Sequence, residues 1–512
     1  DGSGVADSPT QVMSGLLGAL LHPEVKKAAV IGLGTGSSAG WLGQVPSIER
    51  VDVVEIEPVI LEVSRAFEPV NGRPLDNPKV HVAIEDAREF LASTKERYDL
   101  VFSEPSNPYR AGIASLYTVE FYEAVAERLE QNGMLLQWVQ GYEIDARTLR
   151  FIYATLNAVF PYVETWELRT HDFLLVASRE PITYDVERLR ARIQEEPFRT
   201  ALANAFRVTD LEGVLGHFVA TADFTKRLLA GYDGLLNTDD LSPVEFGFAR
   251  DVGGSEMALS DDLRWLAAQY GHHRPQLPEG SVDWQKVADA WNAFPLFVDD
   301  MRAPPANPQT AAQWRIVARA HFSQGDLDGV LRAWRMQPDP PTNPTDLEML
   351  ALALANAGEE EALVHAQKLR ETFPPADVDA IVAHLAFRKG NLQEAHRALS
   401  ASLRRYRNDP WVHTISMNLA LDLVPMLTAA DPKLVPEYLK LLEKPFVLHL
   451  MDSRRETVRQ ALAQRLPDPN ACVAILEEKE PFVPWDAQFL ATRQACYARA
   501  NHPLFETATR DL

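Results

Sequence analysis

Short apolar runs alternate with amphipathic stretches from residue 28 to about residue 180, and this alternation restricts the fold more than any other feature of the chain. A short apolar run bounded by turns is typical of a strand that is buried on both faces, and an amphipathic stretch between two such runs is typical of a crossover helix. The pattern predicts parallel strands at residues 28–33, 51–56, 80–84, 98–103 and 134–139.

Two further apolar runs, VETWEL near residue 163 and FLLVAS near residue 173, leave little room for a helix between them. We therefore expect the last two strands to be antiparallel. Helices are predicted at 58–67 and 118–133, with Gly133 as the C-terminal cap of the second. Seven strands with a reversed final pair indicate an α/β fold, with a class I methyltransferase-like Rossmann sheet.

The C-terminal part of the chain differs, because no strand pattern follows residue 306 and proline-rich breaks separate helical stretches. Gly325, Gly358 and Gly390 are spaced by 33 and 32 residues, and an alanine precedes each by seven residues. A period of this length, with a small residue where two helices cross and a glycine at the turn, resembles tetratricopeptide repeats. An irregular helical bundle is the alternative.

Composition excludes several classes. Fifty Lys and Arg against 72 Asp and Glu give a net charge of −22, which disfavours binding to nucleic acid. Cys472 and Cys496 lie in no zinc-binding pattern, and we expect buried thiols in preference to a single bridge. No apolar run is long enough for a membrane helix, although the chain starts without Met, so an upstream segment is a candidate membrane tether.

Polar and glycine residues follow three successive predicted strands. Gly32, Gly34 and Gly36 form a glycine loop between a strand and a helix, Glu55 ends the second strand, and Asp86 ends the third. Ligands of open α/β sheets bind at the carboxyl ends of the strands, where an acid can accept both ribose hydroxyls. The three features favour an adenosine-type ligand, and the acid after the third strand favours an S-adenosyl compound over NAD.

The fourth strand runs into the loop SEPSNPY, which spans residues 103–109 and contains Glu104. This loop lies opposite the predicted nucleoside, and Glu104 could take a proton from an attacking amine or hold it by a charged hydrogen bond. A rigid turn with a solvated Glu104 is the alternative. In the later run LNTDDLSP, we expect Asp239 and Asp240 to cap a turn before Pro243, and a position facing the cleft is the alternative.

These motifs together resemble the spermidine synthase (polyamine aminopropyltransferase) family over about residues 1–250, most closely a bacterial branch often fused behind a membrane segment. The motifs that carry the resemblance are IGLGTG, VVEIEP, EDAREFL, YDLVFSEPSNP, LYTVEFYEAVAERLEQNGMLLQW and LNTDDLSPVEF. The resemblance implies that Glu55 binds ribose, that Asp86 binds adenine and that Glu104 is the catalytic acid of the gate loop. It also implies that Thr10 and Gln11 line the cleft.

Three positions depart from the family pattern. Thr35 replaces an acid that attracts the aminopropyl ammonium, Asn107 replaces an acid that grips the diamine, and Thr10 replaces a tyrosine. Tyr109 follows in the same loop and is a further candidate substrate contact. A buried ammonium without its carboxylate is costly, so these changes reduce the preference for a cationic substrate and admit intact S-adenosylmethionine.

We therefore expect a transferase that uses S-adenosylmethionine or its decarboxylated form, without a metal, to alkylate a small-molecule amine or another acceptor. The alternatives are methyl transfer, cleavage of S-adenosylmethionine, and a silent nucleoside-binding module with a protein or peptide partner on the repeats. A cytoplasmic location is expected. The predicted segments are a stub at 1–27, an adenosyl-binding domain at 28–181, a helical extension at 182–250, a linker with helices at 251–305, repeats at 306–410 and a helical cap at 411–512.

Overall fold

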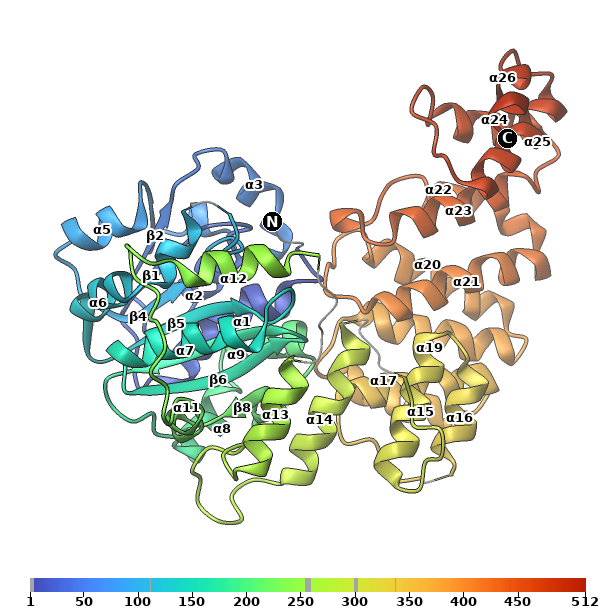
Figure 1. Ribbon diagram of the computed structural model, residues 1–512. Coiled ribbons are helices and arrows are strands. Elements are labelled where there is room, and N and C mark those ends of the chain that lie inside the picture. The colour runs from blue at the N-terminus through green and yellow to red at the C-terminus, as the bar shows by residue number, and fades with distance from the viewer. Residues whose placement is uncertain (1–3, 111, 254–258, 299–302, 337) are drawn as a thin grey trace. The chain divides into compact units, whose positions relative to one another are not determined.

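The structure is a computed structural model, and it describes residues 4–110, 112–253, 259–298, 303–336 and 338–512. The start of the predicted stub (1–3) and parts of the predicted linker (254–258 and 299–302) lie outside the described residues. The chain divides into two compact units, coloured from blue to green and from yellow to red in Figure 1. The first unit comprises Asp1–Pro304 and Pro340–Asp346, and the second comprises Pro305–Asp339 and Leu347–Leu512.

The first unit is built on one eight-stranded sheet with the strand order β3-β2-β1-β4-β5-β7-β6-β8. Neighbours from β3 to β5 are parallel, whereas β7 is antiparallel to both β5 and β6, and β8 is antiparallel to β6. The predicted α/β class and the reversed last pair are confirmed. The strands are β1 Lys27–Ile31, β2 Arg50–Glu55, β3 Val80–Ile84, β4 Tyr98–Ser103, β5 Leu129–Gln140, β6 Tyr162–Arg169, β7 Asp172–Ser178 and β8 Phe218–Ala220.

The order in which successive strands are added to the sheet reverses at β1. Strands β2 and β3 lie on one side of β1, and the chain then returns to place β4 on the other side. In open α/β sheets, ligands bind beyond the carboxyl ends of the strands at such a switch point. The ends of β1 and β4 therefore mark the expected ligand position.

Helices cover the sheet. The helices of the first unit are α1 Ser8–Leu21, α2 Ser37–Gly43, α3 Ile60–Ala66, α4 Glu68–Asn71, α5 Ala87–Ser93, α6 Val119–Arg128, α7 Ala146–Val159, α8 Val186–Arg192, α9 Phe198–Ala201, α10 Leu211–Leu215, α11 Ala222–Leu228, α12 Pro243–Asp251, α13 Leu259–Gln269 and α14 Trp284–Phe297, with short helices η1 Pro74–Asp76, η2 Ile113–Tyr117 and η3 Leu202–Phe206.

Helix α1 occupies most of the predicted N-terminal stub, and every one of its residues is buried. A Cβ atom added at Gly18 would lie 2.8 Å from the side chain of Leu136 and 3.1 Å from that of Leu100. Helix α1 therefore lies directly on β4 and β5, and this close approach requires glycine at position 18. The segment before the first strand thus forms part of the core of the sheet unit.

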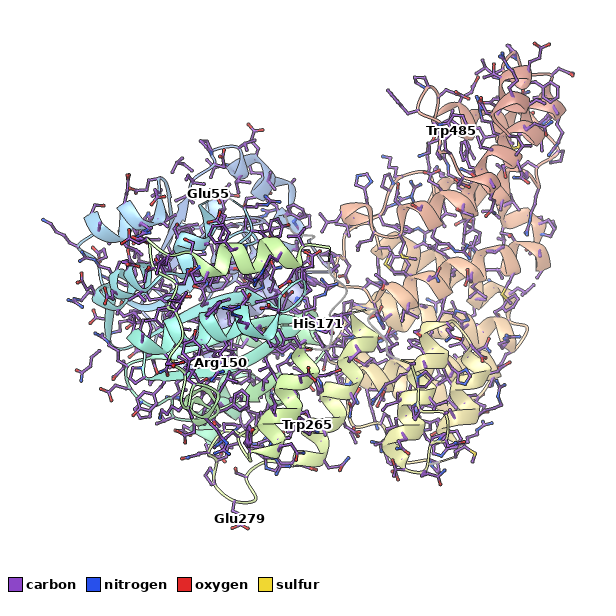
Figure 2. All side chains as sticks on the ribbon, in the orientation of Figure 1. Glu55, Arg150, His171, Trp265, Glu279 and Trp485 are labelled. Atoms are coloured by element: carbon purple, nitrogen blue, oxygen red, sulfur yellow. A yellow bond between two sulfur atoms is a disulfide. The ribbon has the colours of Figure 1, made fainter. Side chains whose placement is uncertain are left out.

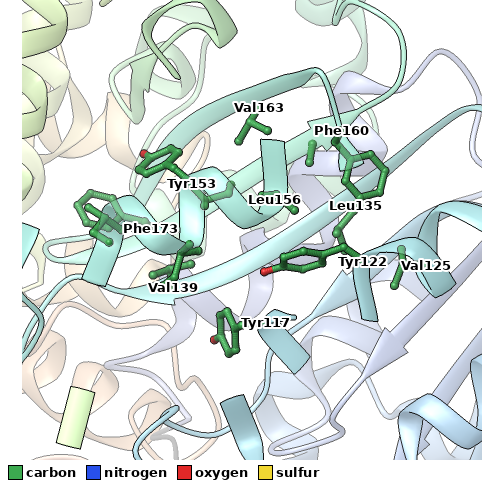
Figure 3. Packing of buried hydrophobic residues seen from close by; sticks show 14 of the residues in the cluster. Tyr117, Tyr122, Val125, Leu135, Val139, Tyr153, Leu156, Phe160, Val163 and Phe173 are labelled. Carbon is green, nitrogen blue, oxygen red and sulfur yellow. The ribbon is translucent and has the colours of Figure 1, made fainter. Parts of the chain in front are cut away.

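The opposite face of the sheet carries a large apolar core, which helices α6 and α7 cover. Figure 3 shows aromatic side chains of this core, among them Tyr122 from α6 and Tyr153 from α7, against Val139 and Phe173 from the strands. All four side chains are buried, and each large apolar side chain removed from water contributes roughly 1.5–3 kcal/mol. This core fixes the strand ends that carry the candidate site.

Two details of the sheet differ from the sequence prediction. Helix α6 ends at Arg128, and Gly133 lies inside β5, where a Cβ atom would meet the Tyr98 carbonyl oxygen at 3.0 Å. The helix stops early because Leu129 is extended and pairs with Tyr98 of β4. Strand β8 was not predicted, because three residues within a helical region give no measurable alternation.

The second unit is helical. Its helices are α15 Ala311–Ser323, α16 Leu327–Trp334, α17 Pro344–Ala357 (whose first residues belong to the first unit), α18 Glu361–Arg370, α19 Pro375–Arg388, α20 Leu392–Arg405, α21 Thr414–Ala430, α22 Val435–Leu441, α23 Asp452–Ala463, α24 Asn470–Glu477, α25 Ala487–Ala500 and α26 Phe505–Asp511, with short helices η4 Pro432–Leu434 and η5 Val447–His449.

The three glycines of the predicted repeat each occupy a turn between two helices. Gly325, Gly358 and Gly390 have φ angles of +74°, +79° and +72°, which other residues rarely adopt. The alanines seven residues before them are fully buried: Ala318, Ala351 and Ala383. Five residues after the glycines, Val330 and Ala395 are buried, whereas Leu363 is 44% exposed. Assignment to the tetratricopeptide class stays a prediction.

The two cysteines form a disulfide, so the expectation of buried thiols is wrong. Cys472 in α24 and Cys496 in α25 are both buried, and their Cα atoms are 6.0 Å apart. This distance falls within the range that a disulfide spans. A separation of 24 residues gives no recognisable pairing pattern, and only the packing of α24 against α25 brings the side chains together.

Among the described residues, no helix is long and apolar enough to cross a membrane.

Candidate functional site

The glycine loop follows β1 and passes close to the residue after β4. The Gly32 N–H donates to the Val54 carbonyl at 2.8 Å, and a Cβ at Gly32 would lie 2.9 Å from the Glu104 carbonyl oxygen. Gly32 also has a φ of +93°, so any other residue is excluded here on two grounds. At Gly34, by contrast, an added Cβ would meet nothing within 4 Å. The backbone at Gly34 is therefore open to an approaching group.

Glu55 connects the end of β2 to this loop, and its position is labelled in Figure 2. Its carboxylate is buried and accepts hydrogen bonds from the Leu33 N–H and the Glu57 N–H, each at 2.9 Å. A carboxylate has about four lone-pair sites, so two acceptor sites are left after these bonds. The arrangement fits an acid that holds two hydroxyl groups.

Asp86 caps the N-terminus of α5. Its Oδ1 accepts from the Arg88 N–H at 2.8 Å and from the Glu89 N–H at 3.2 Å, and the residue is exposed. The cap explains why a helix starts directly after β3, and the second carboxylate oxygen stays accessible for a polar group of a ligand.

Two exposed apolar side chains that the sequence analysis did not single out lie near Glu55. Ile56 follows Glu55 directly and is 63% exposed, and Ile84 pairs with Glu55 in the sheet and is 42% exposed. An exposed isoleucine at a strand end can cover the face of a flat, apolar ring. The signal in the sequence was an isoleucine placed directly after the strand-ending acid.

Thr35 and Gln11 form a buried polar contact between the glycine loop and α1. The Thr35 hydroxyl donates to Gln11 Oε1 at 2.7 Å and lies 3.0 Å from Ser37 Oγ. The Ser38 hydroxyl donates to the Gln11 carbonyl oxygen at 2.6 Å. The structure thus brings Gln11 beside the glycine loop, although the two are more than twenty residues apart.

Glu104 lies at the carboxyl end of β4, next to the same loop. Ser38 Oγ donates to Glu104 Oε2 at 3.3 Å, and the Glu104 N–H donates to the Ile31 carbonyl at 3.2 Å. Burial raises the pKa of the Glu104 carboxyl to about 7, and the Ser38 hydrogen bond opposes this rise while Asp172 adds to it. An acid with a pKa near neutral pH suits proton transfer.

The gate-loop candidates Asn107 and Tyr109 are half-buried. Tyr109 packs against the apolar core of the sheet unit. A hydrogen bond from Asn107 lowers the pKa of Tyr142, although burial raises that pKa overall to about 12. Asn107 and Tyr142 therefore face each other after β4 and β5, and Tyr142 is a site neighbour that the sequence analysis did not identify.

Thr10 precedes Gln11 on α1 and contacts β7. Its hydroxyl donates to Asp172 Oδ2 at 2.8 Å across 162 residues of sequence. Burial raises the pKa of Asp172 to about 6, while the Thr10 hydrogen bond opposes the rise. Asp172 gave no signal in the sequence, because it stands at the start of a predicted strand with no motif around it.

The LNTDDLSP segment packs against η2. The buried Asn237 side chain donates to the carbonyl oxygens of Ala114 at 3.1 Å and Tyr117 at 3.0 Å. Asp239 does not cap the turn: its Oδ1 accepts from Arg88 at 2.7 Å, and the Thr238 hydroxyl caps the turn instead by accepting from the Leu241 N–H at 3.1 Å. The segment therefore ties α5, beside Asp86, to η2.

No cluster of three or more His, Cys, Asp or Glu side chains that could hold a metal ion occurs within the described part of the chain. A surface depression of about 430 Å³, lined by residues that include Arg97, Glu130 and Arg179, lies at the start of β5, away from the strand ends that carry Glu104. It does not belong to the candidate site.

The fold and the site define a class I methyltransferase-like Rossmann domain with a glycine loop and three acids at its carboxyl edge. A model of the spermine/spermidine synthase domain matches residues 10–170. Residues 10–170 are therefore similar to the spermine/spermidine synthase domain.

Curated relatives are named polyamine aminopropyltransferases, which are transferases. One from Clostridium perfringens is 28% identical over 177 residues, covering 33% of this chain and 62% of the relative. One from Alkaliphilus metalliredigens is 31% identical over 149 residues, covering 29% of this chain and 52% of the relative. The chain thus spans about half to three fifths of the length of these relatives.

Solved structures of similar fold include a spermidine synthase in complex with the transition state analogue AdoDATO, at 20% identity and a TM-score of 0.34 over 37% of this chain and 68% of that chain. The spermidine synthase from Thermotoga maritima gives 21% identity and a TM-score of 0.34 over 37% of this chain and 67% of that chain. Human methyltransferase-like protein 13 in complex with SAH gives 20% identity and a TM-score of 0.31 over 38% of this chain and 92% of that chain.

Proposed function

We propose that the first unit transfers an alkyl or aminopropyl group from an S-adenosyl sulfonium to an amine. The observation that carries this proposal is Glu104, which lies in the gate loop beside the glycine loop and whose carboxyl has a pKa raised to about 7. The curated relatives, named polyamine aminopropyltransferases, support the same reaction class.

The residues present fit an adenosyl group. Glu55 keeps two acceptor sites for ribose hydroxyls, the backbone at Gly34 is open, and the exposed side chain of Ile56 is available for the adenine ring. Asp86 keeps one accessible oxygen for the exocyclic amine. All of these groups lie at the ends of β1, β2 and β3, so one ligand could contact them together.

In the proposed reaction, Glu104 acts as the base. The amine nitrogen attacks a carbon bonded to the sulfonium, the new N–C bond forms as the C–S bond breaks, and the bonding pair goes to sulfur, which becomes a neutral thioether. Glu104 takes the proton that the nitrogen loses. Because the sulfonium is already an activated leaving group, the protein supplies positioning and deprotonation.

Transfer from intact S-adenosylmethionine is the second candidate, because a specific observation favours it. The position of the family's ammonium-binding acid is Thr35, whose hydroxyl is already bonded to Gln11 at 2.7 Å. No carboxylate stands there to select the decarboxylated form. Methyl transfer or cleavage of S-adenosylmethionine would follow from this candidate, and a silent nucleoside-binding module is the third.

A product assay tests these candidates. The full chain is incubated with each S-adenosyl compound and a panel of amines, and the nucleoside product is identified. Methylthioadenosine that depends on amine supports the proposal, S-adenosylhomocysteine supports methyl transfer, and binding without any product supports the silent module. Glu104→Gln should lose the product. The matched control is Glu62→Gln, because Glu62 is an exposed glutamate on α3.

We further propose that the helical unit binds a protein or peptide partner. Stacked helical hairpins present extended surfaces that suit this task, and the proposed chemistry requires none of them. The proposal predicts that variants on exposed positions of this unit leave turnover unchanged while they abolish partner capture.

A further inference from the structure

Ser38 carries a buried hydroxyl that lies between α1 and the candidate base. It is the second residue of α2 and is 6% exposed. Its Oγ donates to the Gln11 carbonyl oxygen of α1 at 2.6 Å and to Glu104 Oε2 at 3.3 Å. A hydroxyl has one proton, so it can donate fully to only one of two acceptors at a time. Ser38 therefore has two alternative hydrogen-bond arrangements.

The backbone around Ser38 and Glu104 is held in place by close contacts. Helix α2 packs tightly on α1, because a Cβ atom at Gly15 would lie 3.3 Å from the Ser38 carbonyl oxygen. The Glu104 N–H donates to the Ile31 carbonyl at 3.2 Å, and a Cβ at Gly32 would lie 2.9 Å from the Glu104 carbonyl oxygen. The Ser38 hydroxyl can thus turn from one acceptor to the other by rotation about its own C–O bond, without movement of the backbone.

The other groups that face the Glu104 carboxyl disfavour its charge or are neutral. Asp172 of β7 and Asp7, which precedes α1, both raise its pKa, and Tyr117 of η2 is a neutral neighbour whose own pKa Glu104 raises. The Ser38 hydrogen bond lowers the pKa of Glu104, and no other described residue donates to this carboxylate. Of these four neighbours, Ser38 is therefore the one that stabilises the ionised form.

We propose that Ser38 is a positioning residue that serves Glu104 during proton transfer by turning its hydroxyl between two acceptors. The Ser38 hydroxyl donates to Glu104 when Glu104 is ionised. Once Glu104 has taken the proton from the amine, the carboxyl O–H donates to Ser38 Oγ, and the Ser38 hydroxyl turns to the Gln11 carbonyl oxygen. Ser38 neither gains nor loses a proton, and both states of Glu104 keep a hydrogen bond. The inference rests on the proposed function, because it assigns the partner of the proposed base.

The first experiment follows the Glu104 carboxyl by carbon-13 NMR in the full chain, so it requires no turnover. Ser38→Ala removes the donor, and we expect the titration midpoint of Glu104 to rise by roughly 0.5–1 pH unit, because the ionised form loses its hydrogen bond. Ser38→Thr keeps the hydroxyl and should restore the wild-type midpoint. The matched control is Ser14→Ala, which removes another buried hydroxyl, on α1, and should leave the midpoint unchanged.

The pH dependence of the transfer rate gives a second readout. Ser38→Ala should lower the rate at pH 7 by about two- to fivefold and recover it at higher pH, because the rate follows the ionised fraction of Glu104. Calorimetry with methylthioadenosine checks that each variant is folded. If Ser38 only joined α2 to α1, Ser38→Ala would lower thermal stability or nucleoside affinity and leave the midpoint in place, which would overturn the inference.

Failure of the inference and failure of the proposed function give different results. An unchanged midpoint in Ser38→Ala, or an equal rise in Ser38→Ala and a folded Ser38→Thr, overturns the inference whatever the turnover. If Ser38→Thr does not fold, Ser38→Cys replaces it; the thiol is a weak donor and should give an intermediate midpoint, and a midpoint equal to that of Ser38→Ala overturns the inference. Wild type that makes no product from any S-adenosyl compound and amine contradicts the proposed function, and the role of Ser38 in proton transfer falls with it.

Discussion

Buried charges have different surroundings in the two units. In the helical unit, the buried guanidinium of Arg493 contacts Glu480 at 2.8 Å and Asp511 at 2.6 Å, and Arg459 contacts Glu478 at 2.6 Å. At the carboxyl edge of the sheet unit, the Ser38 hydroxyl donates to Glu104 and the Thr10 hydroxyl donates to Asp172, and the charge of Asp172 raises the pKa of Glu104.

This difference separates two uses of a buried charge. A buried ion pair whose hydrogen bonds are satisfied fixes the packing of helices, because removing one partner leaves the other uncompensated. A buried carboxylate without a cation has a raised pKa and can bind or deprotonate a cationic ligand. Glu167 in the same sheet is paired with Arg264 at 2.6 Å, so the lack of a cation partner is not a property of every buried carboxylate of the sheet.

The largest expected effect is on turnover. Glu104→Gln removes the proposed base while it keeps the size of the side chain, and we expect the transfer rate to fall by roughly 10²–10⁴. Binding of methylthioadenosine should stay unchanged. Initial rates and calorimetry measure the two quantities, with Glu62→Gln as the control. A Glu104→Gln variant with at least half the wild-type rate would place the base elsewhere.

The next effect concerns the stability of the helical unit. Replacing Cys472 and Cys496 by serine opens a loop of 24 residues, and we expect the free energy of unfolding of this unit to fall by about 3 kcal/mol. The unfolding transition of the sheet unit should not shift. It can be identified as the transition that methylthioadenosine stabilises. Equal shifts in both transitions would show that the two units do not unfold independently.

Trapping of free thiols in intact cells also tests the expected cytoplasmic location, because disulfides persist in oxidising compartments.

A third prediction concerns the nucleoside end of the site. Glu55→Ala should weaken methylthioadenosine binding by about 1–3 kcal/mol, since it removes an acceptor for the ribose and releases the Leu33 N–H. Asp86→Ala should have a smaller effect, because Asp86 is exposed to water. Calorimetry measures both, and Glu62→Ala serves as the control. If Glu55→Ala bound methylthioadenosine with wild-type affinity, the assignment of Glu55 to the ribose would be wrong.

The smallest expected effect comes from removing the helical unit. A chain that ends at residue 346 and also lacks residues 306–339 loses almost all of the helical unit. It keeps Thr342, whose hydroxyl donates to Asp289 at 2.9 Å within the first unit. We expect its affinity for methylthioadenosine to stay within about threefold of the full chain. A well-folded truncated chain that binds no adenosyl compound would assign part of the site to the helical unit.

The sequence was sufficient for the strands but not for all of the site. Strands 80–84 and 98–103 match the structure at both ends, because each is an apolar run bounded by turn residues. Glu104 could be predicted because it follows a strand end. Asp172 could not, since its contact with Thr10 spans 162 residues and no local pattern encodes it. The disulfide was missed for the same reason, whereas β8 was too short to give a periodic signal.

The most direct test of the contrast between the two units is the titration of the Glu104 carboxyl, followed by carbon-13 NMR and assigned with Glu104→Gln. Burial raises the pKa of this group to about 7 from an ordinary value of 4.5. The folded chain therefore holds the proton more tightly than the unfolded chain, so Glu104 stabilises the fold at low pH and this contribution is lost as pH rises from about 4.5 to 7. We predict a midpoint near pH 7 and a transfer rate that rises with pH through the same range. A midpoint at or below pH 4.5 would mean that Glu104 is paired, like the buried charges of the helical unit, and would contradict the account.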